Sequence, residues 1–385
     1  MKIKTLSELS IGGKGNYGIA ASAVPYSNDL YTYLRITDIT DDGNLKLDGL
    51  MSVADENADK YILEPNDIVF ARTGGSTGRN YFYDGTDGTF VYAGFLIKFS
   101  IDPQKVIPKY IKYYCQSDDY KGWVQSYLSG STRGNINAKT YGLMPIPIPN
   151  IDQQKGIVSL LSSIDCKIKL NNEINKNLEQ QAQAIYQQMF IDNASSNWTE
   201  GTLNDIADIT MGQSPSGSSY NEDGNGIIFF QGRAEFGFRF PTVRLYTIEP
   251  KRMACANDTL MSVRAPVGDL NVAHTDCCIG RGLAAIHSKN NHQSFVLYTM
   301  FSLKKQLDVF NGEGTVFGSI NRNSLKEMPI LIPSREKIYE FEALVAPMDA
   351  AIRNNYDEIS RLEKLRDSLL PKLMSGELEV SNIDL

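Results

Sequence analysis

The side chains best suited to contact a ligand lie in a glycine-rich segment that follows the β-favouring run Ile68–Phe70. This segment reads Arg72-Thr73-Gly74-Gly75-Ser76-Thr77-Gly78-Arg79-Asn80. Arginine can donate two hydrogen bonds to guanine, asparagine can pair with adenine, and hydroxyl and backbone N–H groups can bind phosphate oxygens. Glycine lets the backbone approach a ligand closely. The segment therefore predicts contact with nucleic acid, and an ordinary surface hairpin is the alternative.

Related segments occur elsewhere in the chain. Arg264-Ala265-Pro266-Val267-Gly268-Asp269-Leu270-Asn271 occupies the matching place in the second half. A second pair consists of residues 129–135 and residues 311–322, and the segments 31–37 and 231–239 add further arginines. Recurrence in both halves strengthens the nucleic-acid interpretation. The candidate DNA-contacting residues are Arg35, Arg72, Thr73, Gly74, Ser76, Thr77, Arg79, Asn80, Arg133, Asn135, Arg233, Arg264, Asn271, Ser319, Asn321 and Arg322.

Motifs for catalysis are missing from the sequence. A loop that holds a flipped adenine for methylation requires two adjacent prolines, and the chain has no such pair. The only Gly-Lys dipeptide, Gly13-Lys14, has Glu8 where a phosphate-binding loop requires glycine. We therefore expect no catalytic residue, no bound metal and no bound cofactor. Because nuclease carboxylates have a loose signature, a standalone nuclease or DNA-modifying enzyme with its own target recognition domains stays as the alternative.

Composition limits the class of protein further. The chain has 385 residues, of which 42% are hydrophobic, and this length indicates more than one domain. No apolar run reaches the ~18 residues that a membrane span needs, and the N-terminus lacks the apolar segment of a secretory signal. Five cysteines without a Cys-x-x-Cys pair are typical of a reducing compartment. We expect a cytoplasmic protein without a membrane or small-molecule partner.

The chain contains an internal repeat. Gly134-Asn135-Ile136-Asn137 and Met144-Pro145-Ile146-Pro147 recur as Gly318-Ser319-Ile320-Asn321 and Met328-Pro329-Ile330-Leu331, and the match continues without a gap to Leu178/Leu362. Upstream, Asp67–Arg72 resembles Asp258–Arg264, and Gly12–Gly15 loosely resembles Met211–Ser214. The repeat predicts globular regions at 1–150 and 193–334, each followed by a helical region at 151–192 and 335–385. Short strands mixed with helices indicate an α+β fold.

Each helical region carries apolar residues at alternating spacings of three and four, which predicts a heptad seam. The seam includes Ile164, Ile168, Asn171, Leu178, Met348, Ile352, Asn355 and Leu362. A long helix cannot bury such a seam alone, so we expect the two helices to pair within the chain as an antiparallel coiled coil with pseudo-two-fold symmetry. A homodimeric coiled coil is the alternative. Asn171 and Asn355 either fix the register or face solvent at a loosened crossing.

Two prolines and one glycine bear on the course of the second helix. Pro347 lacks an N–H donor and should kink or restart the helix. Pro371 should end the regular part of the helix, and Gly376 should stop it.

The net charge of −7 is unevenly distributed. Regions 1–150, 151–192 and 193–334 each carry a net charge of −1, and region 335–385 carries −4. The excess of acidic residues therefore lies where we expect protein partners. Globular regions that are nearly neutral should bind phosphate weakly alone, so tight DNA binding should need partner subunits.

These features together resemble the specificity subunit of type I restriction-modification systems. The resemblance rests on the duplicated plan of domain plus helix, the arginine–glycine turns, the Ile-Pro-Ile-Pro stretch and the ending Leu369-Leu370-Pro371-Lys372-Leu373-Met374-Ser375-Gly376. It implies a non-catalytic subunit with two target recognition domains that read a bipartite DNA target. It also implies that two methyltransferase subunits with S-adenosylmethionine dock on the helices and methylate adenine. A translocase-nuclease subunit with ATP and magnesium would join them.

Overall fold

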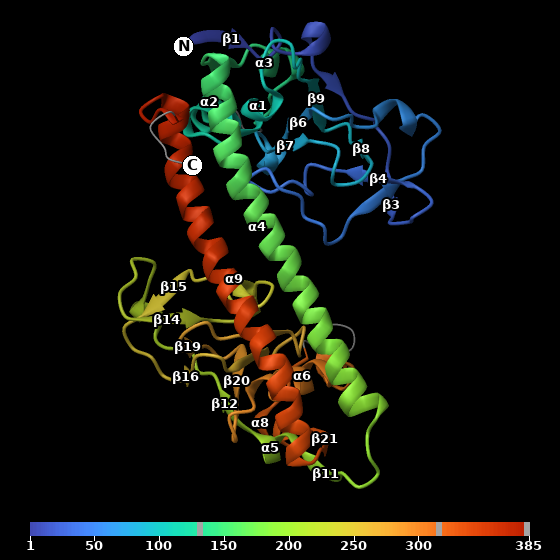
Figure 1. The fold of residues 1–385 in the computed structure, drawn as a ribbon, viewed down its shortest axis with the longest axis vertical. Coiled ribbons are helices and arrows are strands. Elements are labelled where there is room, and N and C mark those ends of the chain that lie inside the picture. Colours follow the sequence, from blue (N-terminus) through green and yellow to red (C-terminus); the bar gives the residue numbers. More distant parts are fainter. Residues whose placement is uncertain (129–133, 313–317, 381–385) are drawn as a thin grey trace. The chain divides into compact units, whose positions relative to one another are not determined.

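The computed structural model describes residues 1–128, 134–312 and 318–380, which form two compact units. Unit 1 combines Met1–Ile168 with Ser360–Leu385, and unit 2 comprises Lys169–Ile359. Two long helices, α4 (Ile151–Tyr186) and α9 (Arg335–Ser375), each run through both units. Figure 1 shows α4 in green and α9 in red, with one α/β domain in each unit.

The domain of unit 1 has two four-stranded sheets and one two-stranded sheet. Their strand orders are β2-β9-β6-β7, β3-β5-β4-β8 and β1-β10, and every pair is antiparallel except β4 with β8. The elements are β1 (Lys2–Thr5), β2 (Asn16–Tyr17), β3 (Ala23–Pro25), β4 (Tyr31–Leu34), β5 (Met51–Val53), β6 (Asp67–Ala71), β7 (Asn80–Tyr83), β8 (Phe90–Tyr92), β9 (Leu96–Ser100), α1 (Pro108–Tyr114), α2 (Asp118–Leu128), α3 (Ala138–Gly142) and β10 (Pro145–Ile148).

The domain of unit 2 repeats this topology. Its sheets have the orders β12-β20-β17-β18, β13-β15-β14-β19-β16 and β11-β21, and β14 with β19 is again the parallel pair. The elements are β11 (Thr199–Thr202), α5 (Leu203–Ile206), β12 (Ala207–Met211), β13 (Tyr220–Asn221), β14 (Ile227–Phe230), β15 (Leu245–Thr247), β16 (Met253–Ala254), β17 (Thr259–Ser262), β18 (Leu270–Val272), β19 (Cys277–Ile279), β20 (Leu283–Ser288), α6 (Gln293–Ser302), α7 (Lys304–Leu307), α8 (Arg322–Lys326) and β21 (Pro329–Ile332). The place of strand β16 at the sheet edge is taken in unit 1 by a single antiparallel bridge between Ile62 and Val91 of β8.

The repeated sequence motif has a structural basis in the two short helices α3 and α8. Asn137 and Asn321 are their N-caps, and each side chain accepts a hydrogen bond from the backbone N–H three residues later, at 2.9 and 3.0 Å. Ile136 and Ile320 are buried beside them. The motif therefore has the same structural role in both halves: its asparagine caps a short helix and its isoleucine fills the core.

The structure corrects the alignment of the two N-terminal parts. The N–H of Gly18 donates to Leu96 O, and the N–H of Gly212 donates to Leu283 O, at the same point of the matching sheets. A Cβ at either glycine would lie within 2.3 Å of a backbone oxygen. Tyr17-Gly18 is thus the counterpart of Met211-Gly212, and the resemblance of Gly12–Gly15 to that segment is wrong.

The long helices complete the cores of both domains. In unit 1, Leu161 of α4 and Leu373 of α9 pack into the cluster that contains Phe70 and Tyr110. In unit 2, Tyr186 of α4 and Phe341 of α9 pack with the domain's Phe295, and a π-helical turn (Gln187–Asp192) extends α4. Each domain is therefore built on the pair of helices rather than tethered to it. This confirms an α/β domain with paired helices in each half.

Contacts between the helices show that the pair is antiparallel. In unit 1, Asp165 of α4 lies 3.5 Å from Arg366 of α9. In unit 2, the amide of Asn171 donates to Glu358 at 2.8 Å, and the amide of Asn355 donates to Asn175 at 2.9 Å. Residue numbers rise along α4 as they fall along α9. The pairing is within one chain, as expected from the duplicated seam.

The asparagines form a polar layer inside the seam. Asn171 is 1% exposed and Asn175 is 3% exposed. Their hydrogen bonds cross to the other helix. Of the two asparagines in the predicted seam, Asn171 is buried and Asn355 is half-buried, and both are hydrogen-bonded across the helix pair, which favours the register role over exposure to solvent. A buried amide pairs fully in only one register, so the layer favours this alignment of the helices.

The prolines do not interrupt α9, which is continuous from Arg335 to Ser375. The expected restart at Pro347 and the expected end at Pro371 are both wrong. Apolar burial is the physical reason, since Val345, Leu370 and Leu373 are all buried close to a proline. The helix ends where Gly376 adopts a left-handed conformation with φ of 79°, as predicted.

Within the described ranges, no helix is long and apolar enough to cross a membrane.

Candidate nucleic-acid interface

The glycine-rich loop of unit 1 closes on its own strand. The N–H of Ala71 donates to Arg79 O at 2.8 Å, and the N–H of Gly78 donates to Ala71 O at 3.0 Å. Gly78 has φ of 94°, a conformation that favours glycine. The hydroxyl of Thr77 donates to Gly74 O at 2.8 Å. These bonds fix the backbone that presents the loop side chains.

The structure brings both candidate segments of unit 1 together. Thr73 forms a β-bridge with Asn135, and the N–H of Ile136 donates to Arg72 O at 2.9 Å. Thr73, Gly74, Ser76 and Asn135 all lie at least partly exposed on this surface. Arg133, from the same predicted segment, lies outside the described residues.

Unit 2 has the same arrangement of backbone. The N–H of Ser262 donates to Asp269 O, and the N–H of Gly268 donates to Ser262 O, both at 2.9 Å. Arg264 forms a β-bridge with Ser319, and the N–H of Ile320 donates to Val263 O at 3.1 Å. Gly268 has φ of 84°. The two loops therefore share one framework.

This framework changes the alignment of the loop residues by one position. Arg72 and Val263 occupy equivalent places, because each accepts the N–H of the buried isoleucine that follows the second segment. Thr73 is then the counterpart of Arg264, and Arg79 is the counterpart of Asp269. The match of Arg72 with Arg264 suggested by the sequence is wrong, since the turn of unit 2 is one residue shorter.

Arg72 lies against an aromatic ring that the sequence did not single out as its partner. Its guanidinium lies 5.0 Å from the centre of the Tyr17 ring. Its Nε atom is buried without a hydrogen-bond partner among the described residues. The equivalent places in unit 2 hold Met211 and Val263, which carry no charge. An arginine held on a ring is oriented at little cost in side-chain entropy, which suits recognition of a planar base.

Other arginines of unit 1 are held by carboxylates. Arg79 Nε donates to Asp41 at 2.7 Å, and Arg35 donates through two nitrogens to Asp38, at 2.9 and 2.6 Å. In the Arg79–Asp41 pair, Asp41 is the exposed member, with 85% of its side chain accessible. Asn80 is buried, and its amide donates to Cys115 O at 3.0 Å. Asn80 and Arg35 therefore support the loops.

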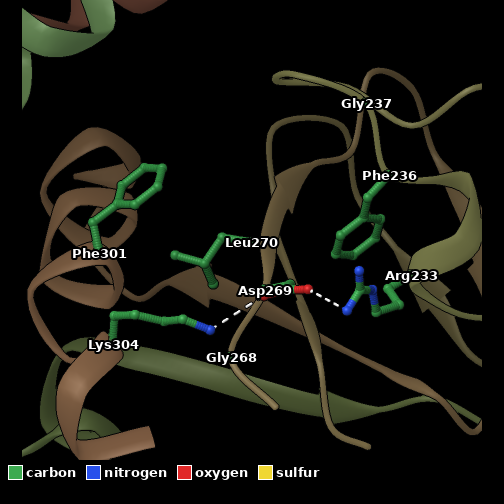
Figure 2. A pocket seen from close by; sticks show the side chains of 8 residues that line it. All are labelled: Arg233, Phe236, Gly237, Gly268, Asp269, Leu270, Phe301 and Lys304. Atoms are coloured by element: carbon green, nitrogen blue, oxygen red, sulfur yellow. Dashed lines mark hydrogen bonds and ion pairs between the residues drawn. The ribbon is translucent and has the colours of Figure 1, made fainter. Parts of the chain in front are cut away.

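In unit 2, Asp269 lies between two cations. Figure 2 shows this carboxylate between Arg233, at 2.9 Å, and Lys304, at 3.2 Å. The three residues line a cavity of about 430 Å³ together with Phe236, Leu270 and Phe301. Lys304 comes from α7 and was not among the residues expected from the sequence. Its sequence neighbourhood, Leu303-Lys304-Lys305-Gln306, has no glycine-rich or arginine motif that could have indicated it.

The remaining candidates of unit 2 differ in exposure. Arg264, Ser319 and Arg322 are exposed. Asn321 is exposed, but its side chain caps α8. Asn271 is buried, and its amide donates to Gly237 O at 2.9 Å, so it fixes the loop that follows Arg233.

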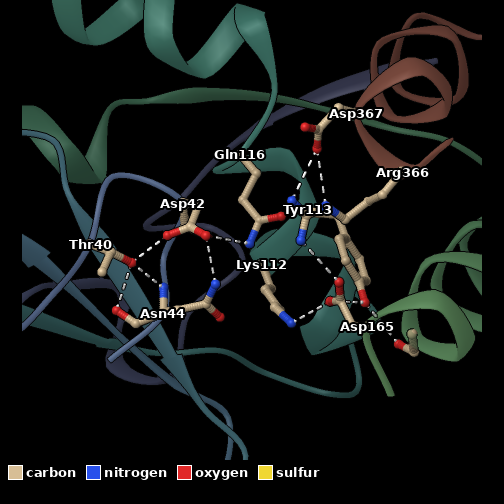
Figure 3. A network of polar contacts seen from close by, with 10 residues as sticks. Thr40, Asp42, Asn44, Lys112, Tyr113, Gln116, Asp165, Arg366 and Asp367 are labelled. Carbon is tan, nitrogen blue, oxygen red and sulfur yellow. Dashed lines mark hydrogen bonds and ion pairs between the residues drawn. The ribbon is translucent and has the colours of Figure 1, made fainter. Parts of the chain in front are cut away.

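Each domain is bonded to the helix pair through an aspartate. The two aspartates, Asp165 and Asp349, occupy equivalent positions in the sequence repeat. In unit 1, Asp165 of α4 accepts from Lys112 at 2.8 Å and from the Tyr113 hydroxyl at 3.0 Å (Figure 3). The same network reaches loop 40–44, where Gln116 donates to Asp42 O at 3.2 Å. The acidity of Asp42 reflects opposing effects. Burial disfavours its charged form, but hydrogen bonds from Thr40 and Asn44 outweigh this and hold its pKa below the usual value.

In unit 2, the equivalent carboxylate is Asp349, and the cation that it binds is buried. Arg239 is 5% exposed and donates to Asp349 at 3.0 Å and to the Tyr298 hydroxyl at 3.2 Å. It also lies 3.0 Å from Glu179 of α4, in ion-pair contact without hydrogen-bond geometry. Burial raises the pKa of Glu179, and the nearby Arg239 partly offsets this. The cluster joins the domain to both helices.

Among the described residues, no group of three or more histidine, cysteine, aspartate or glutamate side chains is arranged to hold a metal ion.

Comparisons with known proteins agree on one family. The family described as "Type I restriction modification DNA specificity domain" matches residues 2–180 and 195–359. The putative type I restriction enzyme MjaX specificity subunit of Methanocaldococcus jannaschii is 28% identical, over 91% of this chain and 88% of its own length. The HindI specificity subunit of Haemophilus influenzae is 20% identical, over 83% of this chain and 88% of its own length.

A solved structure shows the same fold. The S subunit of the type I restriction-modification system from M. genitalium aligns with a TM-score of 0.59 at 17% identity, covering 97% of this chain and 95% of that one. The family match spans most of the sequence and follows its internal repeat. The chain therefore belongs to the type I restriction-modification family, as a non-catalytic DNA specificity subunit.

Proposed function

We propose that the chain reads a bipartite DNA target with two target recognition domains, residues 1–150 and 193–334. Regions 151–192 and 335–385 would form the spacer between them. The observation that carries this proposal is that both domains hold an equivalent loop in the same backbone framework, with different side chains on it. A protein that recognises two different DNA sequences is expected to carry different loops on the same backbone framework.

The helix pair would also recruit the catalytic subunits. Its region 335–385 carries most of the excess negative charge, which favours a protein partner over DNA. In this family, cofactors generally belong to partner subunits. We infer that two methyltransferase subunits with S-adenosylmethionine bind this chain, and that a translocase-nuclease subunit with ATP and magnesium joins the complex, in the cytoplasm.

The proposed DNA contacts are the exposed and half-exposed side chains of the loops. In the first domain these are Arg72, Thr73, Ser76, Thr77 and Asn135. The proposal also includes the backbone of Gly74, and Arg133, which lies outside the described residues. In the second domain they are Arg233, Arg264, Ser319 and Arg322. Arg35, Arg79, Asn80, Asn271 and Asn321 would act by holding the loops in place, because each is bonded within the domain.

Two arginine variants test this proposal. The assembled complex with Arg72→Ala should lose ~1–3 kcal/mol of binding free energy at one half-site, since a base contact is worth about that much. The complex with Arg264→Ala should weaken the other half-site. Binding would be measured on duplexes in which one half-site at a time is scrambled.

Lys60→Ala is the matched control, because it removes a positive charge from the first domain outside the loops. It should leave both half-sites unchanged. A loss at both half-sites in either arginine variant, or at neither, would contradict the assignment of one domain to each half-site. DNA cleavage or methylation by the pure chain, supplied with magnesium and S-adenosylmethionine, would contradict the non-catalytic role.

A further inference from the structure

The equivalent positions Arg79 and Asp269 carry opposite charges on the same backbone. Each follows a glycine with positive φ, and each backbone carbonyl accepts an N–H from the end of the preceding strand. In the first domain the cation is at this position, and its carboxylate partner Asp41 is the exposed group. In the second domain the carboxylate is at this position, and its cation partners are the exposed groups. Arg233 is 46% exposed and Lys304 is 41% exposed.

This inversion places two cations at a cavity. Arg233 and Lys304 contact different oxygens of the same carboxylate, at 2.9 and 3.2 Å. Their nitrogens are thus separated by no more than two hydrogen-bond lengths and the width of a carboxylate. An oxyanion of similar width can accept from both nitrogens when it approaches from the cavity.

The walls of the cavity suit a backbone group rather than a base edge. Gly237 and Gly268 also line the cavity, and each is packed too closely against its own domain to carry a side chain. Phe236, Leu270 and Phe301 supply the rest of the lining visible in Figure 2 and offer no side-chain hydrogen bond to a base. The polar side chains that line it are Arg233, Lys304 and Asp269.

The cluster has no net charge of its own. Asp308 lies 3.4 Å from Lys304, so two carboxylates balance the two cations. A contact here is therefore local, and it does not depend on long-range attraction by a basic surface. Asp269 keeps the two long side chains in place before a ligand arrives, which reduces the entropy lost on binding.

We propose that Arg233 and Lys304 form a binding site for one phosphodiester of the target duplex, present in the second domain and replaced by the Arg79–Asp41 pair in the first. This inference rests on the proposed function, because it names a contact of that same DNA interface. The site positions the duplex and carries no sequence information.

The test measures DNA affinity of the assembled complex over a range of salt concentrations. Arg233→Gln, Lys304→Gln and the double variant are compared with Lys305→Gln. Lys305 is the next residue of the same helix, is exposed and does not line the cavity. All single variants change the net charge equally, so the comparison isolates the cavity.

We expect each cavity variant to weaken binding to target and to unrelated duplexes by the same factor. The slope of log affinity against log salt should become shallower by about one in the double variant, as for loss of one phosphate contact. Lys305→Gln should leave the slope unchanged. An unchanged slope in the double variant, or a changed preference among target sequences, would overturn the site. Failure of the proposed function is distinguishable, because the unmodified complex would then show no preference for any target.

Discussion

At the scale of single residues, the Arg239 cluster is the most constrained polar feature of unit 2. A buried cation lies between Asp349 and Glu179, and the Tyr298 hydroxyl completes its surroundings. Burial opposes the charge of Arg239, but its three neighbours outweigh this and hold its pKa above the usual value. Removing one member of a buried ion cluster leaves the others without compensation.

Arg239→Met should therefore lower the free energy of unfolding by ~3–5 kcal/mol at neutral pH. The loss should shrink as the pH falls. Burial already raises the pKa of Glu179, and removing Arg239 raises it further, so the folded variant takes up a proton more readily than the unfolded chain. Stability of the variant then rises toward the wild-type value as pH drops. Denaturant unfolding at several pH values measures this.

A triple variant controls for the shape of the side chains. Arg239→Met combined with Glu179→Gln and Asp349→Asn removes all three charges, so most of the lost stability should return. A single variant that is as stable as the wild type, or equally destabilised at every pH, would show that the cluster is not held by charge.

At the scale of elements, the two short helices α3 and α8 offer a matched pair of caps. Asn137→Ala and Asn321→Ala should each lower the free energy of unfolding by about 1 kcal/mol, because an orphan N–H loses its acceptor. Aspartate at either position should restore the cap. Thermal or denaturant unfolding checks this result.

The cap at Asn321 also separates two interpretations of that residue. If Asn321 acts only as a cap, Asn321→Asp should keep the DNA preference of the assembled complex. If its amide reads adenine, the same variant should lose that preference while remaining stable.

Much of the element pattern could be predicted from the sequence, because it depends on local or periodic signals. The heptad spacing around Ile164 and Ile352 identified the helix pair, and the repeated motif around Ile136 and Ile320 identified the duplication. Pro371 misled the prediction, since burial of Leu370 and Leu373 outweighs one missing hydrogen bond.

The candidate site was predictable only in part. Sequence composition pointed to the glycine-rich loops, but the partners of their side chains come from distant segments. Asp41 lies 38 residues from Arg79, and Lys304 lies 35 residues from Asp269. Arg72 and Val263 are equivalent only through backbone hydrogen bonds, which no comparison of residue types could align.

At the scale of the whole molecule, one scaffold is used twice. The same strand order recurs in both units, and each unit contributes a carboxylate, Asp165 or Asp349, to the junction of domain and helices. The two globular regions are each nearly neutral, with a net charge of −1. Such nearly neutral regions would gain little free energy from release of counterions, so we propose that tight DNA binding needs the partner subunits.

We propose above all that the two domains of this chain recognise two separate DNA sequences. The most direct measurement is sequencing of methylated sites in DNA from cells that carry the chain with its partner subunits. We expect methylation within a target of two short specified blocks separated by a spacer of fixed length without sequence preference. We also expect that Arg72→Ala alters only one block. A single uninterrupted target, or a change in both blocks from this one substitution, would contradict the account.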